Sequence, residues 1–184
     1  PVLPIYTYGT PALRRKAQPV KTLSDDVIQL IMDMFETMHY ANGIGLAATQ
    51  VGNLWRVVVI DLSEMEETKD LKPIVLINPV VVSQEGSWTM EEGCLSIPDV
   101  RDDVERIGKL RVQFKNVDFR DTELEAAGLL GRVILHEIDH LNGVLFLDHL
   151  PPDKKKLHNP LLRKIQKGEF EVPYPVVTAV EVAV

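Results

Sequence analysis

The sequence predicts an α+β protein in which mostly antiparallel sheets pack around one central metal-binding helix. Two observations predict this class. Several β-branched segments fill the middle of the chain, and a helix near the start and an apolar helix after them flank this region. The 184 residues suffice for one hydrophobic core, so we expect residues 1–184 to form a single domain. Residues 151–184 are expected to be a helical and tail extension of that domain.

Two helices are expected before the strands. Thr10 followed by Pro11 is typical of a helix start, so residues 11–16 are expected to form a short helix. Ser24, an N-cap residue followed by two aspartates, opens a longer helix that ends at Gly43. The buried face of this helix is expected to carry apolar residues at helical spacing, namely Val27, Ile31, Met34, Phe35 and Met38.

The strands are expected where β-branched residues gather or alternate with polar ones. These segments are residues 55–61, 74–82, 87–91, 104–117 and 122–126. Pro79 interrupts the second segment, which indicates a sheet edge or a bulge. The charged segment 62–72 is expected to be a surface loop. The central helix is expected over residues 129–142, ended by Gly143, and a further short helix over 159–168.

Charge and composition exclude several classes of function. Apolar residues make up 45% and charged residues 26%, as in an ordinary globular protein. The net charge of −7 argues against nucleic acid as the main ligand, so no DNA partner is expected. The sequence has no apolar run of membrane-spanning length and no signal-peptide pattern, so no membrane partner is expected. The single cysteine, Cys94, excludes an intramolecular disulfide and favours a reducing compartment.

The segment from His136 to His140 carries the strongest chemical signal. Its two histidines lie four residues apart, hence on one face of a helix, where both can bind one metal ion. Glu137 lies about 100° further round the helix, where it can act as a general base beside the metal without being a ligand. Packed histidines in an apolar helix are the ordinary alternative, but three ionisable groups among apolar neighbours need partners or a function.

A hydrolytic metal site usually takes three protein ligands and keeps one position open. Cys94 lies between Gly93 and Pro98, in what is expected to be an irregular loop that can direct a side chain at such a site. A buried cysteine that only fills the core is the alternative. Residues 43–50, with two glycines and two alanines, allow close approach of a ligand, although a tight connection between a helix and a strand explains them equally well.

Three segments together resemble the signature motifs of peptide deformylases: Gly43-Ile44-Gly45-Leu46-Ala47-Ala48-Thr49-Gln50, Glu92-Gly93-Cys94-Leu95-Ser96 and His136-Glu137-Ile138-Asp139-His140. Their order and spacing match, and the resemblance extends from Ile5 to about Leu150. It implies a catalytic domain that removes the formyl group from the N-terminal formylmethionine of nascent polypeptides. It also implies the bacterial cytoplasm as the location, with an organelle as the open alternative.

The resemblance implies a role for each motif residue. Cys94, His136 and His140 would bind one divalent metal, natively Fe²⁺ and replaceable by Zn²⁺, Ni²⁺ or Co²⁺, with water as the fourth ligand. Glu137 would transfer the proton, while Gln50 and the backbone N–H of Leu95 would stabilise the oxyanion. Gly45 is implied as a further catalytic residue, with the peptide extended against the strand beside it. Gln50 has a simpler explanation as a polar residue at the start of a strand. The residues implied for substrate binding are Gly43, Ile44, Glu92, Gly93, Arg101, Leu129 and Val133.

Several alternatives stay open. A metalloendopeptidase can use the same helix motif, but its third ligand usually lies downstream, where His149 and His158 have no recognisable spacing. A metal site that only holds the fold would have four protein ligands. A basic segment beginning at Lys154 indicates a solvated face or a contact with ribosomal RNA through Lys154, Lys155, Lys156 and Lys164. Asp139 is expected to pair with a basic residue such as Arg106 and so orient the helix.

Overall fold

The computed structural model describes residues 1–182, so the last two residues of the predicted extension 151–184 lie outside the described residues. The strands are β1 (Ile5–Tyr6), β2 (Gly45–Ala47), β3 (Val57–Ile60), β4 (Ile74–Glu85), β5 (Trp88–Cys94), β6 (Ile97–Arg106), β7 (Lys109–Lys115), β8 (Asp121–Ala127) and β9 (Val176–Val177). The α-helices are α1 (Asp25–Tyr40), α2 (Gly128–Leu141), α3 (Pro152–Leu157), α4 (Asn159–Gln166) and α5 (Ala179–Val182). Short 3-10 helices are η1 (Pro11–Arg14), η2 (Ala48–Val51), η3 (Glu66–Thr68) and η4 (Phe146–His149).

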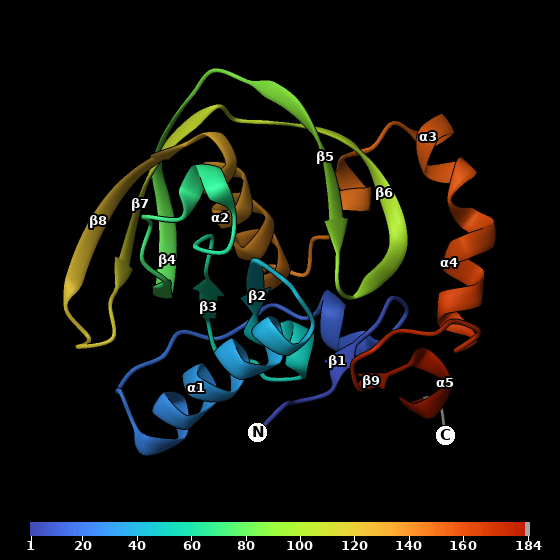
Figure 1. The fold of residues 1–184 in the computed structure, drawn as a ribbon, viewed down its shortest axis with the longest axis horizontal. Helices are drawn as coiled ribbons and strands as arrows, with labels where there is room; N and C mark the ends of the chain where they lie inside the picture. Colours follow the sequence, from blue (N-terminus) through green and yellow to red (C-terminus); the bar gives the residue numbers. More distant parts are fainter. Residues whose placement is uncertain (183–184) are drawn as a thin grey trace.

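A five-stranded antiparallel sheet in the order β2-β3-β4-β7-β8 separates the two longest helices (Figure 1). The alternation of β3 shows how both helices are held. Val58 and Ile60 join the core that α2 covers, whereas Val57 and Val59 join the core that α1 covers. All four residues are buried, because side chains of successive residues point to opposite faces of a sheet. The predicted α+β class, with antiparallel sheets around a central helix, is confirmed.

The β4–β7 ribbon continues as the β5–β6 hairpin, which arches away from the sheet over α2 (Figure 1). Glu85 pairs with Lys109, and the ladder resumes where Trp88 pairs with Arg106. The prediction of one strand over 104–117 is therefore wrong. Ile107 and Gly108 interrupt it between β6 and β7, where the ribbon bends. The alternating apolar residues beyond the break are buried as predicted.

Local signals at the helices and at Pro79 have mixed outcomes. The Ser24 hydroxyl accepts a hydrogen bond from the Val27 N–H and begins α1, as predicted. The helix predicted at residues 11–16 is a single 3-10 turn. At Pro79, β4 shows the predicted bulge as a register shift, but the strand lies between β3 and β7 and not at an edge.

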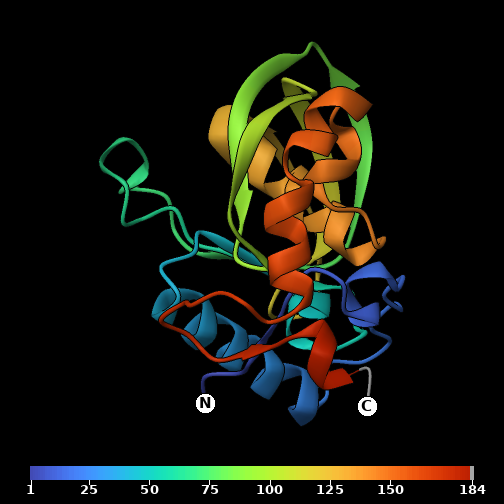
Figure 2. The same ribbon diagram turned by 90° about the vertical axis from the view of Figure 1, so that its right-hand side faces the viewer.

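The C-terminal segment packs outside the β5–β6 hairpin and then returns to the N-terminus (Figure 2). α4 matches the helix predicted at 159–168, whereas α3 was not predicted. β9 pairs in parallel with β1, so a strand near the start of the chain lies beside a strand near the end of the described residues. The loop 62–72 extends from the body, as predicted, and contains η3. Within residues 1–182, no helix combines the length and the apolar character needed to cross a membrane.

Candidate metal centre and active site

Cys94, His136 and His140 lie together, although the first two are 42 positions apart in the sequence. One ligand atom from each residue lies within 4.8 Å of the others. Both histidines project from one face of α2, and Nε2 of His140 is 3.3 Å from Cys94 Sγ. No fourth histidine, cysteine, aspartate or glutamate among residues 1–182 joins this group. Such a set matches an open metal site better than a closed structural one.

Cys94 reaches the helix from the tip of the β5–β6 hairpin. The prediction of an irregular loop is wrong here, because β5 includes Cys94 and β6 begins at Ile97, leaving a two-residue turn. The ladder shifts register between Gly93 and Cys94. A bulge of this kind redirects the side chain that follows it, which explains how a strand residue faces α2.

The electrostatics of the cluster fit a bound cation. Burial alone lowers the pKa of His136, but hydrogen bonds to Cys94 and Glu92 outweigh it and raise that pKa to about 10. The surroundings of His136 therefore stabilise positive charge. Burial also lowers the pKa of His140 well below its ordinary value, which keeps this imidazole neutral and its lone pair available. One cysteine sulfur and two imidazoles form a donor set that suits iron or zinc.

Glu137 lies beside the cluster with few partners. Its side chain is buried, the residue being 4% exposed, and its Oε1 atom has no hydrogen bond within the described part of the chain. Burial raises the pKa of this carboxyl group to about 7. Gly45 of β2 leaves the space that the carboxylate occupies, since a Cβ atom there would stand 2.6 Å from Glu137 Oε2. A buried carboxyl group with a raised pKa can exchange a proton near neutral pH.

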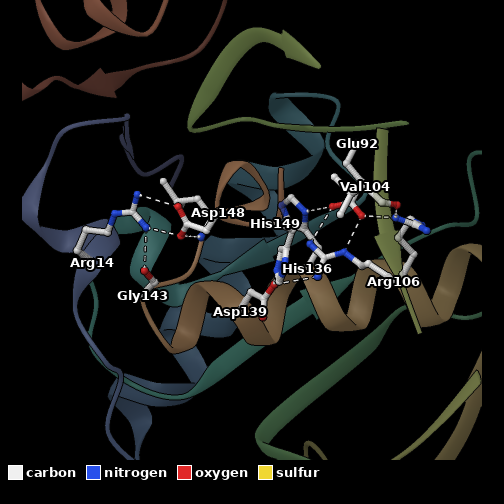
Figure 3. A network of polar contacts seen from close by, with 11 residues as sticks. Arg14, Glu92, Val104, Arg106, His136, Asp139, Gly143, Asp148 and His149 are labelled. Carbon is white, nitrogen blue, oxygen red and sulfur yellow. Dashed lines mark hydrogen bonds and ion pairs between the residues drawn. The ribbon is translucent and has the colours of Figure 1, made fainter. Parts of the chain in front are cut away.

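Glu92 has the opposite surroundings (Figure 3). Its two oxygens accept hydrogen bonds from both arginines that flank it, Arg106 at 2.6 and 2.9 Å and Arg132 through Nη1. Oε1 also lies 2.9 Å from Nδ1 of His136, so the other ring nitrogen is free to face Cys94. Burial opposes ionisation, but His136 and Arg106 lower the pKa of Glu92 to about 2. A carboxylate that holds a ligand imidazole in this way orients it.

The same network continues along α2. The predicted pairing of Asp139 with Arg106 is present, with 2.8 Å between Oδ2 and Nη1, and His149 approaches the same oxygen at 2.8 Å (Figure 3). Arg106 thereby joins Glu92 of the hairpin to Asp139 of the helix. Two ion pairs fix the hairpin that carries Cys94 to the helix that carries the histidines: the half-buried pair of Arg106 with Asp139 and the buried pair of Glu92 with Arg132.

Gln50 lies in η2. The simpler explanation, a polar residue at the start of a strand, is therefore wrong. Its Oε1 accepts a hydrogen bond from the Ala47 N–H at 3.0 Å, which sets the orientation of the amide. The Nε2 atom then faces Ser96 Oγ at 3.2 Å and Cys94 Sγ at 3.5 Å. The Leu95 N–H, in the hairpin turn, donates to no acceptor within residues 1–182. The Leu95 N–H is therefore available next to Cys94, whereas the Gln50 amide already faces the cysteine sulfur and the Ser96 hydroxyl.

A cavity of about 390 Å³ opens beside Glu137 and His136. All the residues that the motif resemblance implied for substrate binding line it, namely Gly43, Ile44, Glu92, Gly93, Arg101, Leu129 and Val133. They do so differently. Ile44, Leu129 and Val133 offer apolar surface, whereas the Glu92 carboxylate is occupied by its ion pairs. Arg101 stands at the exposed rim and pairs with Glu91 at 2.9 Å.

Sequence reasoning missed several residues of the site. Arg132 is buried, bonds to Glu92 and the Val104 carbonyl, and stacks 4.5 Å from the Trp88 ring. A charged residue one turn before His136 in an apolar helix was the signal, because a buried guanidinium needs partners. Met65 and Met90 line the cavity and carried no such signal.

The comparisons with known proteins agree with this geometry. Residues 2–156 match the model of the family described as polypeptide deformylase. A peptide deformylase of Salinibacter ruber is 46% identical over 96% of this chain and 95% of its own length. The crystal structure of a peptide deformylase from Legionella pneumophila is 38% identical, with a TM-score of 0.84 over 92% of this chain and 98% of that one. A structure from Ehrlichia chaffeensis in complex with actinonin is 34% identical, with a TM-score of 0.82 over 92% and 99% of the two chains.

Proposed function

The chain belongs to the polypeptide deformylase family, and we propose that it hydrolyses the N-formyl group of N-formylmethionyl nascent polypeptides with Glu137 as the general base. The reaction adds water to the formyl carbon, breaks its bond to nitrogen, and releases formate and a free amine. The observation that carries the proposal is a buried carboxyl group with no partner on one oxygen, beside a Cys-His-His cluster that opens into a cavity.

Cys94, His136 and His140 are proposed to hold one divalent metal. When bound, the metal would act as a Lewis acid toward the formyl group and would activate water for attack. The donor set suits either iron or zinc, and we propose Fe²⁺ as the native ion, with Zn²⁺, Ni²⁺ or Co²⁺ as replacements. Glu92 would hold the His136 ring in position through Nδ1.

Glu137 is proposed to carry the proton through the reaction. Its carboxylate accepts a proton as water attacks the formyl carbon, and the carboxylic acid then gives that proton to the leaving nitrogen. The burial that raises its pKa to about 7 supports both roles, because neither protonation state is strongly disfavoured near neutral pH.

Negative charge develops on the formyl oxygen as the tetrahedral intermediate forms. The Gln50 amide and the Leu95 N–H are proposed to donate to this oxygen. The fixed orientation of the Gln50 amide, with Nε2 facing the cluster, supports its part. One such donor typically lowers the barrier by about 3 kcal/mol.

The substrate is proposed to place its methionine side chain against Ile44, Leu129 and Val133. The apolar character of these residues supports this choice, since an unbranched thioether gains from burial alone. The peptide is proposed to lie extended along β2, beside Gly45. The position of β2 as the first strand of the sheet supports this, because an extended peptide can add to such an edge.

Three coarser aspects follow from the same assignment. We propose that residues 1–184 act as one catalytic domain, which the pairing of β1 with β9 supports. We propose the bacterial cytoplasm as its location, which the bacterial origin of its relatives supports. We further propose ribosome contact through Lys154, Lys155, Lys156 and Lys164 on α3 and α4. Loss of pelleting with ribosomes after neutralising these lysines would support that contact, and unchanged pelleting would contradict it.

The decisive experiment is a formate assay on protein purified without oxygen. The bound metal would be removed, and Fe²⁺, Zn²⁺, Ni²⁺ and Co²⁺ would be added back one at a time. For each, formate release from formyl-Met-Ala-Ser would be compared with cleavage of an unformylated polypeptide. We expect metal-dependent formate release and an intact polypeptide. The opposite pattern would favour the metalloendopeptidase, for which the later histidines offer little: His149 contacts Asp139 and His158 contacts Asp102.

A further inference from the structure

The C-terminal segment reaches the turn that carries the metal-binding cysteine. After α4 the chain reverses at Gly168 and runs back to β9 without regular structure, through a bend at Pro173 and Tyr174. Tyr174, two residues before β9, donates a hydrogen bond from its hydroxyl to the Leu95 carbonyl at 2.7 Å. These two residues are 79 positions apart in the sequence. No residue of the three signature motifs lies in this segment.

Tyr174 is held firmly enough to position another group. Pro175 restricts the residue before it to an extended conformation. The Pro175 carbonyl accepts a hydrogen bond from the Ile5 N–H at 2.9 Å, and the Thr7 N–H bonds to the Val177 carbonyl at 3.0 Å. Burial, with smaller effects of Cys94 and Asp99, raises the pKa of the Tyr174 hydroxyl to about 12, so it stays protonated and donates.

The hairpin turn is held by both ends of the chain. Tyr174 holds the Leu95 carbonyl, while the Tyr8 N–H, just after β1, holds the Ser96 carbonyl at 2.8 Å. Leu95 and Ser96 are the two residues between β5 and β6, and Cys94 precedes them directly. The Leu95 carbonyl and N–H flank one Cα atom, so holding the carbonyl limits the rotations that orient the N–H and the preceding sulfur.

We propose that Tyr174 is a positioning residue for deformylation, whose hydroxyl fixes the Leu95 turn and thereby aims both Cys94 Sγ and the Leu95 N–H. This inference rests on the proposed function for its catalytic part, but not for its effect on the thiolate. It gives the C-terminal segment a function that the signature motifs do not include. The hydrogen bond of Tyr174 goes to the Leu95 backbone and not to a metal ligand, so the residue acts through the turn.

The test is Tyr174→Phe, which removes one oxygen and keeps the ring. We expect kcat for formyl-Met-Ala-Ser to fall about tenfold, part of the effect of losing an oxyanion donor, while KM changes by less than about twofold. In the Co²⁺-loaded protein, the thiolate-to-cobalt charge-transfer band should shift or broaden as the Cys94 orientation relaxes. Tyr6→Phe is the matched control, because the Tyr6 hydroxyl makes no hydrogen bond within residues 1–182 and β1 itself is retained.

Equal kcat and identical cobalt spectra in the two variants would overturn the proposal, and so would a rise in KM alone. A second variant, Pro175→Ala, keeps the hydroxyl and loosens its support, so a smaller loss in the same direction is expected. This variant also tests the proposal should Tyr174→Phe fail to fold. If the wild-type protein releases no formate, the proposed function fails, yet the cobalt spectra still decide whether Tyr174 positions the thiolate.

Discussion

Glu92 and Glu137 are both buried carboxyl groups beside His136, but they differ in the hydrogen bonds that their oxygens accept. Glu92 pairs with two arginines and an imidazole, and these partners lower its pKa to about 2. Glu137 has an oxygen without a partner within the described chain, and burial raises its pKa to about 7. One carboxylate is fixed in charge and geometry, whereas the other can change its protonation state.

This difference in partners separates a carboxylate that orients a neighbouring side chain from one that can transfer a proton. A buried ion pair contributes little net stability, but removing one partner strands the other and costs about 3–5 kcal/mol. A carboxylate with full partners therefore serves as a fixed anchor. A carboxylate without them has a destabilised charged form, which makes it a stronger base for the same distance from its target. Substitutions that remove the charge and keep the shape should affect the two sites in opposite ways.

Glu137→Gln should give the largest effect on activity. The amide cannot accept and return a proton, so kcat for formyl-Met-Ala-Ser should fall by about 10²–10⁴-fold. Stability should stay unchanged or rise slightly, because the amide removes a buried charge that lacks partners. Formate release, bound metal and the denaturation midpoint would be measured on the same preparation.

The matched control is Glu123→Gln at an exposed position of β8. It should leave formate release, bound metal and the denaturation midpoint unchanged. Undiminished formate release by Glu137→Gln would exclude Glu137 as the base. A large loss of metal in that variant would instead mean that Glu137 helps to hold the ion, contrary to its proposed role.

Glu92→Gln should have a smaller effect on chemistry and a larger effect on structure. The change leaves Arg106 and Arg132 buried with less compensating charge and weakens the hold on His136 Nδ1. We expect metal affinity to fall about 10–100-fold and the free energy of unfolding to fall by about 3 kcal/mol. Metal titration and urea unfolding would measure these. Stability equal to that of Glu137→Gln would contradict the distinction between the two carboxylates.

The sequence was most informative where one local rule decides the structure. Ser24 marks the start of α1, and the spacing of His136 and His140 puts both on one face of α2. Prediction failed where contacts between distant segments decide whether a strand forms and where it ends. The break at Gly108 depends on the ribbon arching over α2, and β9 forms only because β1 lies beside it. A short segment carries no local record of such partners.

The candidate site follows the same division. The family motifs predict the residues of the cluster and of the cavity, and the structure brings those residues together. Some of the contacts that orient them lie within the motifs, such as the bond between Glu92 and His136, but others come from outside the motifs. Arg132 holds Glu92 across 40 positions, and Tyr174 reaches Leu95 across 79. Charge in an apolar helix could have indicated Arg132, but a tyrosine in a proline-containing tail gives no signal by itself.

Gly45→Ala tests whether Glu137 depends on the open space around it. A Cβ atom at Gly45 would stand 2.6 Å from Glu137 Oε2 and 2.8 Å from Val133 Cγ1, so the carboxylate must move. A displacement of about 1 Å can cost about 10²-fold in rate, and a side chain that can rotate away should lose roughly tenfold in kcat. Gly108→Ala is the control, because its Cβ atom would meet nothing closer than 3.6 Å. Equal kcat in the two alanine variants would show that the position of the carboxylate is not restricted by β2.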